Sequence, residues 1–355
     1  MILIDKNIHK AKTLPSKFYL DNSIFEQSKV FFEESIQPIC TINELNNVSI
    51  YPFTYFAKFL NEELLLTNQD GKFHCLSNVC THRGHLVSEC ATSNSSLQCR
   101  YHGRTFELNG RLKNAPGFKE ALNFPTEEDD LKSLSVFDWN NFLFISLNEN
   151  PNVFKILNQI DAILPDFPYK DLSDNPVKKE YTLDCHWALY CDNYLEGFHI
   201  PYVHKGLNED MEWNGYETDI FENVVLQKAK SQDLKNAVFY GKDKTVYAYY
   251  FFIFPNIMLN YYSWGLSINI IEPISTNKTR IKYLVYNLKG KEIPLDSKSS
   301  VDTVELEDQK VVLSVQKGMK SKYYSSGRFS PNMEKGVHYF HRLMSKKLLK
   351  LNSDF

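Results

Sequence analysis

Residues 80–103 read CTHRGHLVSECATSNSSLQCRYHG and contain three cysteines and three histidines. Four of these six residues form two short pairs, Cys80-x-His82 and Cys99-x-x-His102, separated by sixteen residues. Thiolate and imidazole ligands at paired, close spacing are typical of a metal site. The stretch therefore predicts that Cys80, His82, Cys99 and His102 bind a metal centre.

The composition of each pair indicates which metal centre this is. Zinc fingers begin with two cysteines close together and end with two histidines, whereas here each pair has one of each. Such pairs suit a [2Fe–2S] cluster in which one iron takes both thiolates and the other both imidazoles. Gly84 and Gly103 follow the two pairs, where the backbone must approach the cluster and its amides can donate to sulfur. The pattern favours an iron–sulfur cluster over zinc.

This pattern resembles the Rieske family of iron–sulfur proteins. Rieske proteins of respiratory complexes carry an additional cysteine in each loop, joined as a disulfide, but this chain has His85 and Tyr101 at those positions. The sequence is therefore similar to the oxygenase branch of the family, whose clusters have lower potentials. The resemblance implies that the four paired residues hold a cluster that passes electrons to a second site.

A second motif, CHWALYCDNYLEGFHIPYVH, occupies residues 185–204. Glu196 and His199 are three residues apart, so on a helix they would share one face. Pro201 disfavours a helical residue before it, which predicts that the helix ends there and that His204 reaches the same point from the following turn. Two imidazoles and a carboxylate form the facial triad of non-haem Fe(II) oxygenases. The spacing resembles the Rieske oxygenase motif, in which both histidines bind the mononuclear iron.

The third iron ligand is expected on a predicted helix over residues 301–321. Asp308 falls on the apolar stripe of this helix, four residues after Val304, whereas Glu305 and Glu307 are expected on the solvated face. A carboxylate on a buried stripe needs a partner such as Fe(II). The segment EDQKVVLSVQKGMKS also resembles the closing segment of these oxygenases, in which the aspartate before the glutamine binds iron. Asp308 is the predicted ligand, with Glu307 as the alternative.

The resemblance gives two further acidic residues catalytic roles. In most of the family, an aspartate three residues before the first histidine bridges a Rieske histidine of the neighbouring subunit to an iron ligand. Glu196 occupies that position here, as in branches that act on quaternary amines, and its longer side chain can make the same bridge. Asp192 stands where many relatives have asparagine, and it is predicted to order water or the groups around the ligands.

The hydrophobic patterns along the chain predict an α+β fold in three parts. Residues 1–40 form a helical segment that packs on the catalytic domain. Residues 41–150 consist of short alternating strands with turns such as Asp70-Gly71, which is typical of a small all-β module. Residues 151–355 combine helices with long antiparallel strands. The resemblance implies a Rieske [2Fe–2S] domain followed by a helix-grip (START-like) catalytic domain with mononuclear iron.

Composition limits the partners and the location. The chain is 43% hydrophobic and 23% charged, with a net charge of −3, which gives no electrostatic reason to bind nucleic acid or an anionic membrane. We find no run of about 18 apolar residues, and the first residues are not expected to act as a signal peptide. Seven cysteines, an odd number, argue against a disulfide framework. A cytoplasmic protein is expected.

The resemblance also implies a reaction and an assembly. A separate NAD(P)H-dependent reductase or ferredoxin would reduce the cluster of one subunit, and the electron would cross to the iron of the next subunit, where O₂ is activated. This route requires a closed head-to-tail ring, most simply a homotrimer. The sequence has no GxGxxG dinucleotide signature, so NAD(P)H would bind the partner protein.

The substrate is predicted from the aromatic residues of the catalytic strands. An aromatic cage suits a trimethylammonium group through cation–π attraction, and the same rings can stack on an aromatic substrate. Length, Glu196 and CDNYLEGFHIPYVH resemble the choline and carnitine monooxygenase branch. We expect hydroxylation or N-demethylation of a quaternary amine; the alternatives are an aromatic acid or other ring substrate, an electron carrier without oxygenase activity, and a zinc-bound structural protein. Strand alternation should turn about half of eight aromatic residues toward the cavity: Tyr247, Tyr249, Tyr250, Phe251, Phe252, Tyr261, Tyr262 and Trp264.

Overall fold

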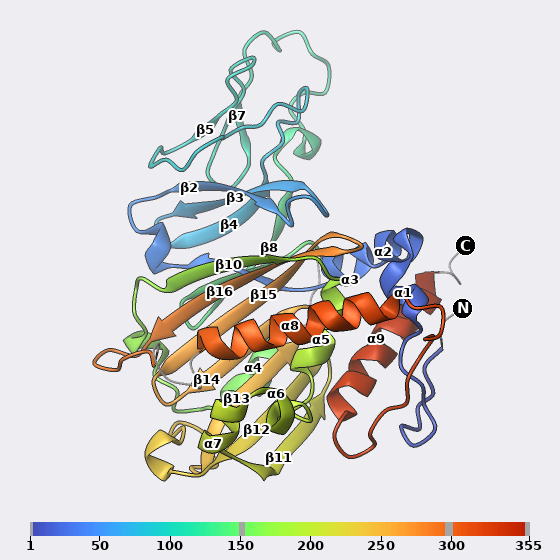
Figure 1. The fold of residues 1–355 in the computed structure, drawn as a ribbon. Coiled ribbons are helices and arrows are strands. Elements are labelled where there is room, and N and C mark those ends of the chain that lie inside the picture. Colours follow the sequence, from blue (N-terminus) through green and yellow to red (C-terminus); the bar gives the residue numbers. More distant parts are fainter. Residues whose placement is uncertain (1–2, 149–152, 295–300, 352–355) are drawn as a thin grey trace. The chain divides into compact units, whose positions relative to one another are not determined.

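The computed structural model describes residues 3–148, 153–294 and 301–351. The chain forms two compact units, one of Glu33–Pro151 and one that combines Met1–Phe32 with Asn152–Phe355 (Figure 1). The expected boundary between residues 150 and 151 lies outside the described residues. No helix of the described residues is long and apolar enough to cross a membrane.

The smaller unit is built from antiparallel strands. Asp70 and Gly71 both have positive φ angles, 52° and 84°, as a type I′ turn requires, and they join β3 to β4 as the sequence predicts. Cys80 and Cys99 belong to the buried apolar cluster of this unit, so its core positions both thiols. The larger sheet has the order β1 (Gln37–Thr41), β9 (Phe142–Ser146), β8 (Ser133–Trp139), β4 (Lys72–Ser77), β3 (Glu62–Gln69), β2 (Ile50–Tyr55); the smaller has β5 (Leu97–Gln98), β6 (Thr105–Phe106), β7 (Leu112–Asn114).

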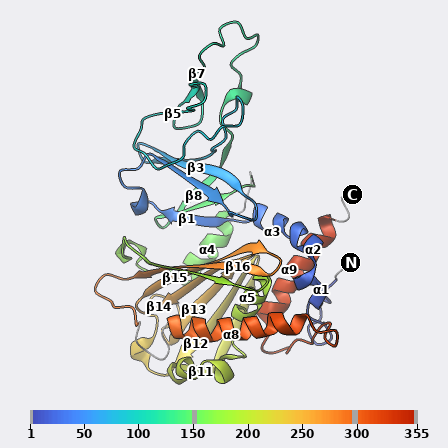
Figure 2. The same ribbon diagram turned by 45° about the horizontal axis from the view of Figure 1, so that its top comes forward.

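The larger unit contains a seven-stranded antiparallel sheet. Phe252 of this sheet packs on Phe340 of α9 at 5.3 Å between ring centroids, whereas Tyr261 packs on Phe167 at 4.8 Å. The two faces of the sheet are therefore covered by different segments, and α5, α8 and α9 lie over one of them (Figures 1 and 2). The strand order is β10 (Val177–Leu183), β16 (Lys278–Asn287), β15 (Gly265–Ser275), β14 (Ile257–Tyr262), β13 (Val246–Ile253), β12 (Val224–Ser231), β11 (Met211–Phe221).

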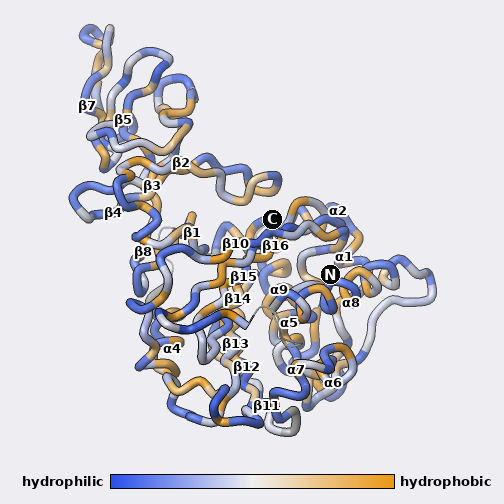
Figure 3. The backbone as a smooth tube through the Cα atoms, turned by 60° about the vertical axis from the view of Figure 1, so that its left-hand side comes forward, coloured by the Kyte–Doolittle hydropathy of each residue, from blue (hydrophilic) through white to orange (hydrophobic). Residues whose placement is uncertain are grey.

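Hydrophobic and hydrophilic residues alternate along much of the chain (Figure 3). β15 is an exception, because nine consecutive residues from Gly265 to Pro273 are buried. A central strand covered on both faces has no solvent side and carries no period-two pattern. The helices that follow the N-terminal segment are α4 (Val153–Ile163), α5 (Trp187–Tyr194), α6 (Ile200–Val203), α7 (Lys205–Asp210), α8 (Val301–Met319) and α9 (Lys335–Leu351). Short 3-10 helices lie at Asn43–Leu45, Glu127–Asp129, Tyr169–Asp171 and Leu234–Asn236.

The N-terminal helical segment is divided into short helices that pack on α5. Asp21 has an extended backbone, with φ −89° and ψ 118°, and its carboxylate accepts a hydrogen bond from the Ser23 amide at 2.8 Å. It therefore ends one helix and caps the next. Phe32 contacts Trp187 at 5.0 Å between ring centroids. The segment comprises α1 (Ser16–Leu20), α2 (Asn22–Gln27) and α3 (Lys29–Glu33).

The helix predicted around the second motif is shorter than expected. It ends at Tyr194, so Glu196 and His199 do not share a helical face. The expectation that the chain leaves helical conformation before Pro201 is also wrong, because Pro201 lies in the first turn of α6. Proline is favoured there, since the first amides of a helix have no partner within the helix and the ring presets φ.

The late helix matches its predicted range closely, but its buried face is rotated. Glu305 is only 4% exposed, and it lies with Val312 and Gln316 on the buried side, whereas Val315 is 40% exposed. The prediction that Glu305 faces solvent is therefore wrong. The side chains of Glu305 and Gln316 make hydrogen bonds inside the protein, which offset part of the cost of burying them.

Candidate metal centres and substrate cavity

The two cysteine–histidine loops of the smaller unit share one geometry. The Cys80 amide donates to the His85 carbonyl at 2.9 Å, and the Gly84 amide donates back to the Cys80 carbonyl at 3.0 Å. The second loop repeats the latter bond, from Gly103 to Cys99 at 3.0 Å. Both glycines have positive φ angles, 71° for Gly84 and 75° for Gly103, which glycine adopts without the strain that a side chain would cause.

These loops bring the four predicted ligands together. The rings of His82 and His102 lie 4.7 Å apart between centroids, and Cys80 and Cys99 are both buried in the same apolar cluster. Nδ1 of His82 is buried and has no hydrogen-bond partner among the described residues. A buried nitrogen without a partner is costly unless it binds a metal. Two thiolates and two imidazoles so placed fit a [2Fe–2S] cluster.

A buried arginine, which sequence reasoning missed, ties the loops together. Arg104 is 3% exposed, and its guanidinium lies over the Phe118 ring at 4.6 Å and the Phe124 ring at 5.2 Å. It donates to the Thr81 hydroxyl at 3.1 Å and lies 3.4 Å from a carboxylate oxygen of Asp129. The positive charge lies beside both loops, where it can stabilise negative charge on a reduced cluster.

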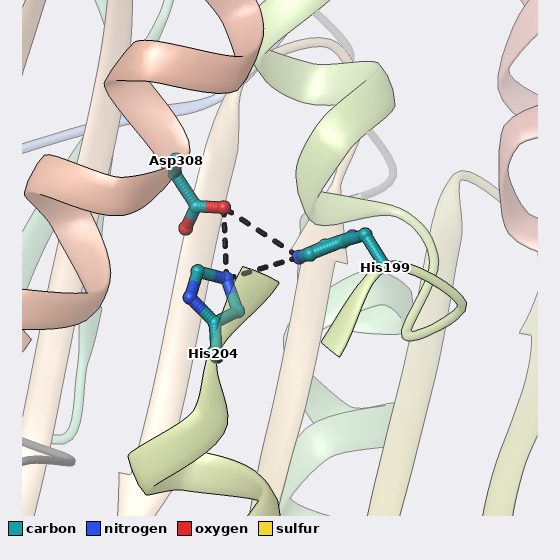
Figure 4. A group of neighbouring side chains, drawn as sticks. All are labelled: His199, His204 and Asp308. Carbon is teal, nitrogen blue, oxygen red and sulfur yellow. Dashed lines mark hydrogen bonds and ion pairs between the residues drawn. The ribbon is translucent and has the colours of Figure 1, made fainter. Parts of the chain in front are cut away.

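In the larger unit, His199, His204 and Asp308 form a compact group (Figure 4). The Nε2 atoms of the two imidazoles lie 3.1 Å apart. Oδ1 of Asp308 lies 3.0 Å from Nε2 of His204 and 3.5 Å from Nε2 of His199. His199 and His204 flank the short helix α6, and Asp308 projects from α8. Two imidazoles and a carboxylate converging from three sides can hold an Fe(II) ion with positions left open.

Each imidazole is held by a second carboxylate. Nδ1 of His199 lies 2.6 Å from Oε1 of Glu196, and Nδ1 of His204 lies 2.7 Å from Oε2 of Glu307. A proton on each Nδ1 leaves each Nε2 free to bind a metal. Glu307, the alternative ligand, therefore lies on the far side of the His204 ring from the metal position.

The carboxylate of Asp308 has its own support. Nδ2 of Asn193 donates to Oδ1 of Asp308 at 2.6 Å, a contact that sequence reasoning missed. Burial lowers the pKa of His204, but the nearby carboxylates of Asp308 and Glu307 outweigh it, so its pKa lies above the ordinary value. The group therefore concentrates negative charge where a cation would bind.

Glu196 reaches His199 from a tight turn. Its Oε2 accepts hydrogen bonds from the backbone amides of Phe198 and His199, the latter at 3.1 Å. The same Glu196 carboxylate therefore stabilises the turn and orients the His199 imidazole. This local structure replaces the helical pairing that the three-residue spacing predicted.

The hydrogen-bond partners of Asp192 are Tyr19 and His341. Its carboxylate accepts from the Tyr19 hydroxyl at 2.7 Å and from Nε2 of His341 at 2.9 Å, and it does not line the cavity. Nδ1 of His341 accepts from the Leu14 amide, which leaves the proton on Nε2 to donate to Asp192. Asp192 ties α5 to α9 and to the N-terminal segment, and its predicted role in ordering water or the groups around the ligands stays a prediction.

A cavity of about 120 Å³ opens beside His199, His204 and Asp308. A single water needs about 10–15 Å³ of such space, so the cavity admits a small organic molecule. Of the eight aromatic residues predicted as candidates, four line it: Tyr247, Tyr250, Tyr262 and Trp264. The other four, Tyr249, Phe251, Phe252 and Tyr261, are at most 2% exposed and pack in the core.

A β-bulge places Tyr247 in this cavity. Ala229 of β12 pairs with Ala248, and the next residue, Lys230, pairs with Val246, so Tyr247 is an extra residue in β13. In a regular strand, Tyr247 and Tyr250 would point to opposite faces. The bulge redirects Tyr247, and both rings line the cavity.

Glu305 is a cavity residue that sequence reasoning assigned to solvent. Its carboxylate accepts hydrogen bonds from the Tyr190 hydroxyl and from Nε2 of Gln309, the latter at 2.7 Å. Burial nevertheless raises the pKa of Glu305 to about 8. Its partner Tyr190 lies on α5. The spacing of apolar residues along the sequence does not show which residues of two separate helices will meet, so it could not predict this contact.

Comparison with known proteins identifies both units. Residues 35–134 match the Rieske [2Fe-2S] domain, and residues 175–350 match the ring hydroxylating alpha subunit catalytic domain. The chloroplastic choline monooxygenase of Amaranthus tricolor is 30% identical over 93% of this chain and 76% of its own. The carnitine monooxygenase oxygenase subunit of Escherichia coli (strain K12) is 27% identical over 96% and 95%. A crystal structure of the quaternary ammonium Rieske monooxygenase CntA has a TM-score of 0.76 at 23% identity, covering 95% of both chains.

Proposed function

Because the chain belongs to the Rieske non-haem iron oxygenases, we propose that it uses O₂ and supplied electrons to hydroxylate or N-demethylate a small quaternary amine. The observation that carries this proposal is the cavity itself, where aromatic rings surround the space next to His199, His204 and Asp308. Aromatic faces attract quaternary ammonium groups. The curated relatives are named for choline and carnitine, which both contain such a group.

The family's cofactors are a [2Fe–2S] cluster, which supplies electrons, and a mononuclear iron, which activates O₂. We assign the cluster to Cys80, His82, Cys99 and His102 in residues 41–150. We assign the iron to the second group, in residues 151–355. The unpaired, buried Nδ1 of His82 and the converging Nε2 atoms of the larger unit support these assignments.

The protein's own residues set up the catalytic site. Glu196 and Glu307 keep the Nδ1 proton on His199 and His204, so each ring presents an unprotonated Nε2. Asn193 holds the carboxylate of the third ligand. The aromatic lining excludes water and orients the substrate, which limits unproductive side reactions.

Electrons come from a separate reductase or ferredoxin, as in the rest of the family. We propose a head-to-tail homotrimer in which Glu196 bridges the iron site of one subunit to a cluster histidine of the next. The exposed aromatic side chains beside each site support such contacts: Tyr202 is 75% exposed near His199, and Tyr101 is 51% exposed beside His102. The cysteines of the described residues form no disulfide, which suits a reducing compartment, and we propose the cytoplasm.

Metal analysis of anaerobically purified protein tests this function. We expect three irons and two acid-labile sulfides per chain, with a Rieske-type EPR signal after dithionite reduction. Oxygen consumption with a reductase should then respond to quaternary amines and not to aromatic acids.

Other results would support the alternatives. Two irons and two sulfides after careful reconstitution would favour an electron carrier without oxygenase activity. Zinc without sulfide would favour a structural protein, and turnover of aromatic acids alone would exclude the amine substrate.

A further inference from the structure

The cavity holds a carboxylate that no cation of the described chain neutralises. Glu305 is 4% exposed, and its oxygens contact the Tyr190 hydroxyl and the Gln309 amide. Among the described residues it forms no ion pair with a lysine, arginine or histidine. Burying an unpaired carboxylate is costly, as its pKa of about 8 reflects.

The hydrogen bonds around Glu305 are directed toward it. Because the Tyr190 hydroxyl donates to Oε2 of Glu305, it must accept from the Tyr283 hydroxyl, which lies 2.6 Å away. Gln309 donates to Oε1 from the same helix. Each carboxylate oxygen thus receives one donor, an arrangement that stabilises the ionised form once a cation is present.

The other acidic groups of the cavity already have partners within the site. Asp308 belongs to the metal-binding group, and Glu196 holds His199. None of the described residues that line the cavity is a lysine or an arginine. A substrate carboxylate would therefore meet three acidic side chains with no counter-ion, which opposes its binding.

Glu305 is also close enough to the iron position to orient a substrate. It precedes Asp308 by three residues on α8, so their side chains share one face, with about 5–6 Å between Cβ atoms. A quaternary nitrogen at Glu305 would hold its substituents beside the metal position. The stacked rings of Tyr262 and Trp264, 4.8 Å apart between centroids, add aromatic surface to the same cavity.

We propose that Glu305 is the specificity-determining residue of this site, and that it selects a quaternary amine with a net positive charge over one that also carries a carboxylate. This inference rests on the proposed function and narrows it. The preferred substrate is then a quaternary ammonium alcohol or a similar cation, not a betaine.

Calorimetric binding to the cluster- and iron-loaded enzyme tests the proposal with three probes. Choline is the cation; 3,3-dimethylbutan-1-ol has the same shape with a neutral tert-butyl group; carnitine adds a carboxylate. The wild-type enzyme should bind choline at least about tenfold more tightly than either other probe. Glu305→Gln should weaken choline binding by roughly ten- to a hundredfold and leave the neutral alcohol unchanged.

A matched control separates local from general charge effects. Asp302→Asn removes one negative charge from α8 at a partly exposed side chain that pairs with Lys179, and it should leave all three affinities unchanged. Retained iron content and melting temperature would show that Glu305→Gln is folded. Gln can keep the bond to Gln309, so loss of structure is not expected.

The outcomes distinguish the two proposals. Carnitine binding as tight as that of choline, or unchanged choline binding by Glu305→Gln, would overturn the role of Glu305 while leaving an amine oxygenase intact. If no quaternary amine binds or is turned over and an aromatic acid is, the proposed function itself fails.

Discussion

The carboxylate of Glu307 accepts a hydrogen bond from Nδ1 of His204 at 2.7 Å, on the opposite side of the ring from the metal position. The adjacent residue, Asp308, lies 3.0 Å from Nε2 of the same imidazole. Two consecutive acidic residues of one helix therefore contact the two ring nitrogens of one histidine. The first sets the position of the ring proton, and the second completes the group of proposed metal ligands.

This arrangement predicts a graded effect at Glu307. Glu307→Ala should weaken Fe(II) binding by about 10- to 100-fold, because His204 loses the group that holds its ring. Glu307→Gln should weaken Fe(II) binding less, since the amide oxygen can still accept a hydrogen bond from Nδ1 of His204. Chelator competition measures both affinities, with Lys310→Gln, an exposed change on the same helix, as the control. Complete loss of iron from Glu307→Gln would instead indicate a ligand.

At Asp308, substitution should abolish the second metal site alone. Asp308→Ala removes one of the three proposed ligands, so mononuclear iron and product formation should be lost. The EPR signal of the reduced cluster should persist, because the cluster ligands lie in the other compact unit. Iron analysis with EPR measures both, and normal turnover by this variant would refute the assignment.

The cluster ligands can be tested against a neighbouring histidine. His102→Ala should bleach or change the cluster spectrum, because one iron loses an imidazole. His85→Ala is the matched control, since His85 lies in the first loop with its Nδ1 2.6 Å from the Leu86 carbonyl and has no predicted ligand role. An unchanged visible spectrum for His102→Ala would rule it out as a ligand.

For Glu196, the expected defect is in electron delivery. Glu196→Gln keeps an oxygen that can accept from Nδ1 of His199, so both metals should remain bound. Loss of the charge should slow the transfer of electrons from the cluster to the iron, measured by stopped-flow in a single turnover. A wild-type rate would remove the bridging role.

His186 makes the larger unit sensitive to acid. It is 1% exposed, and burial lowers its pKa from 6.5 to about 3. Below pH 6.5 the unfolded chain binds a proton that the folded chain excludes, so stability is full above that pH and falls as the pH decreases toward 3. The loss is about 1.4 kcal/mol per pH unit.

A substitution isolates this contribution. Nδ1 of His186 accepts from the Ala188 amide and caps α5, and asparagine is also a good helix cap. His186→Asn should therefore show a smaller fall in melting temperature between pH 7 and pH 5 than the wild type. An equal fall in both proteins would mean that another group controls acid stability.

Local spacing in the sequence proposed candidate ligands that the structure brings close together. The cluster residues lie in two short loops, and Asp308 lies on a helix of nearly the predicted length. Glu305 was misplaced because hydropathy treats a carboxylate as a surface group and contains no information on its hydrogen-bond partner Tyr190, which lies on another helix. The break between Tyr194 and His199 was missed because proline was read as ending a helix when it lies in the first turn of one.

The extra residue at Tyr247 has a consequence for how substrate range can change in this fold. A side chain enters the cavity there because the strand is one residue longer than its partner, not because its neighbours were exchanged. Removing that residue would restore the regular ladder and withdraw a ring from the lining while leaving the iron ligands in place. Insertions and deletions in β13 thus offer a route to altered selectivity that is separate from the chemistry of the metal centre.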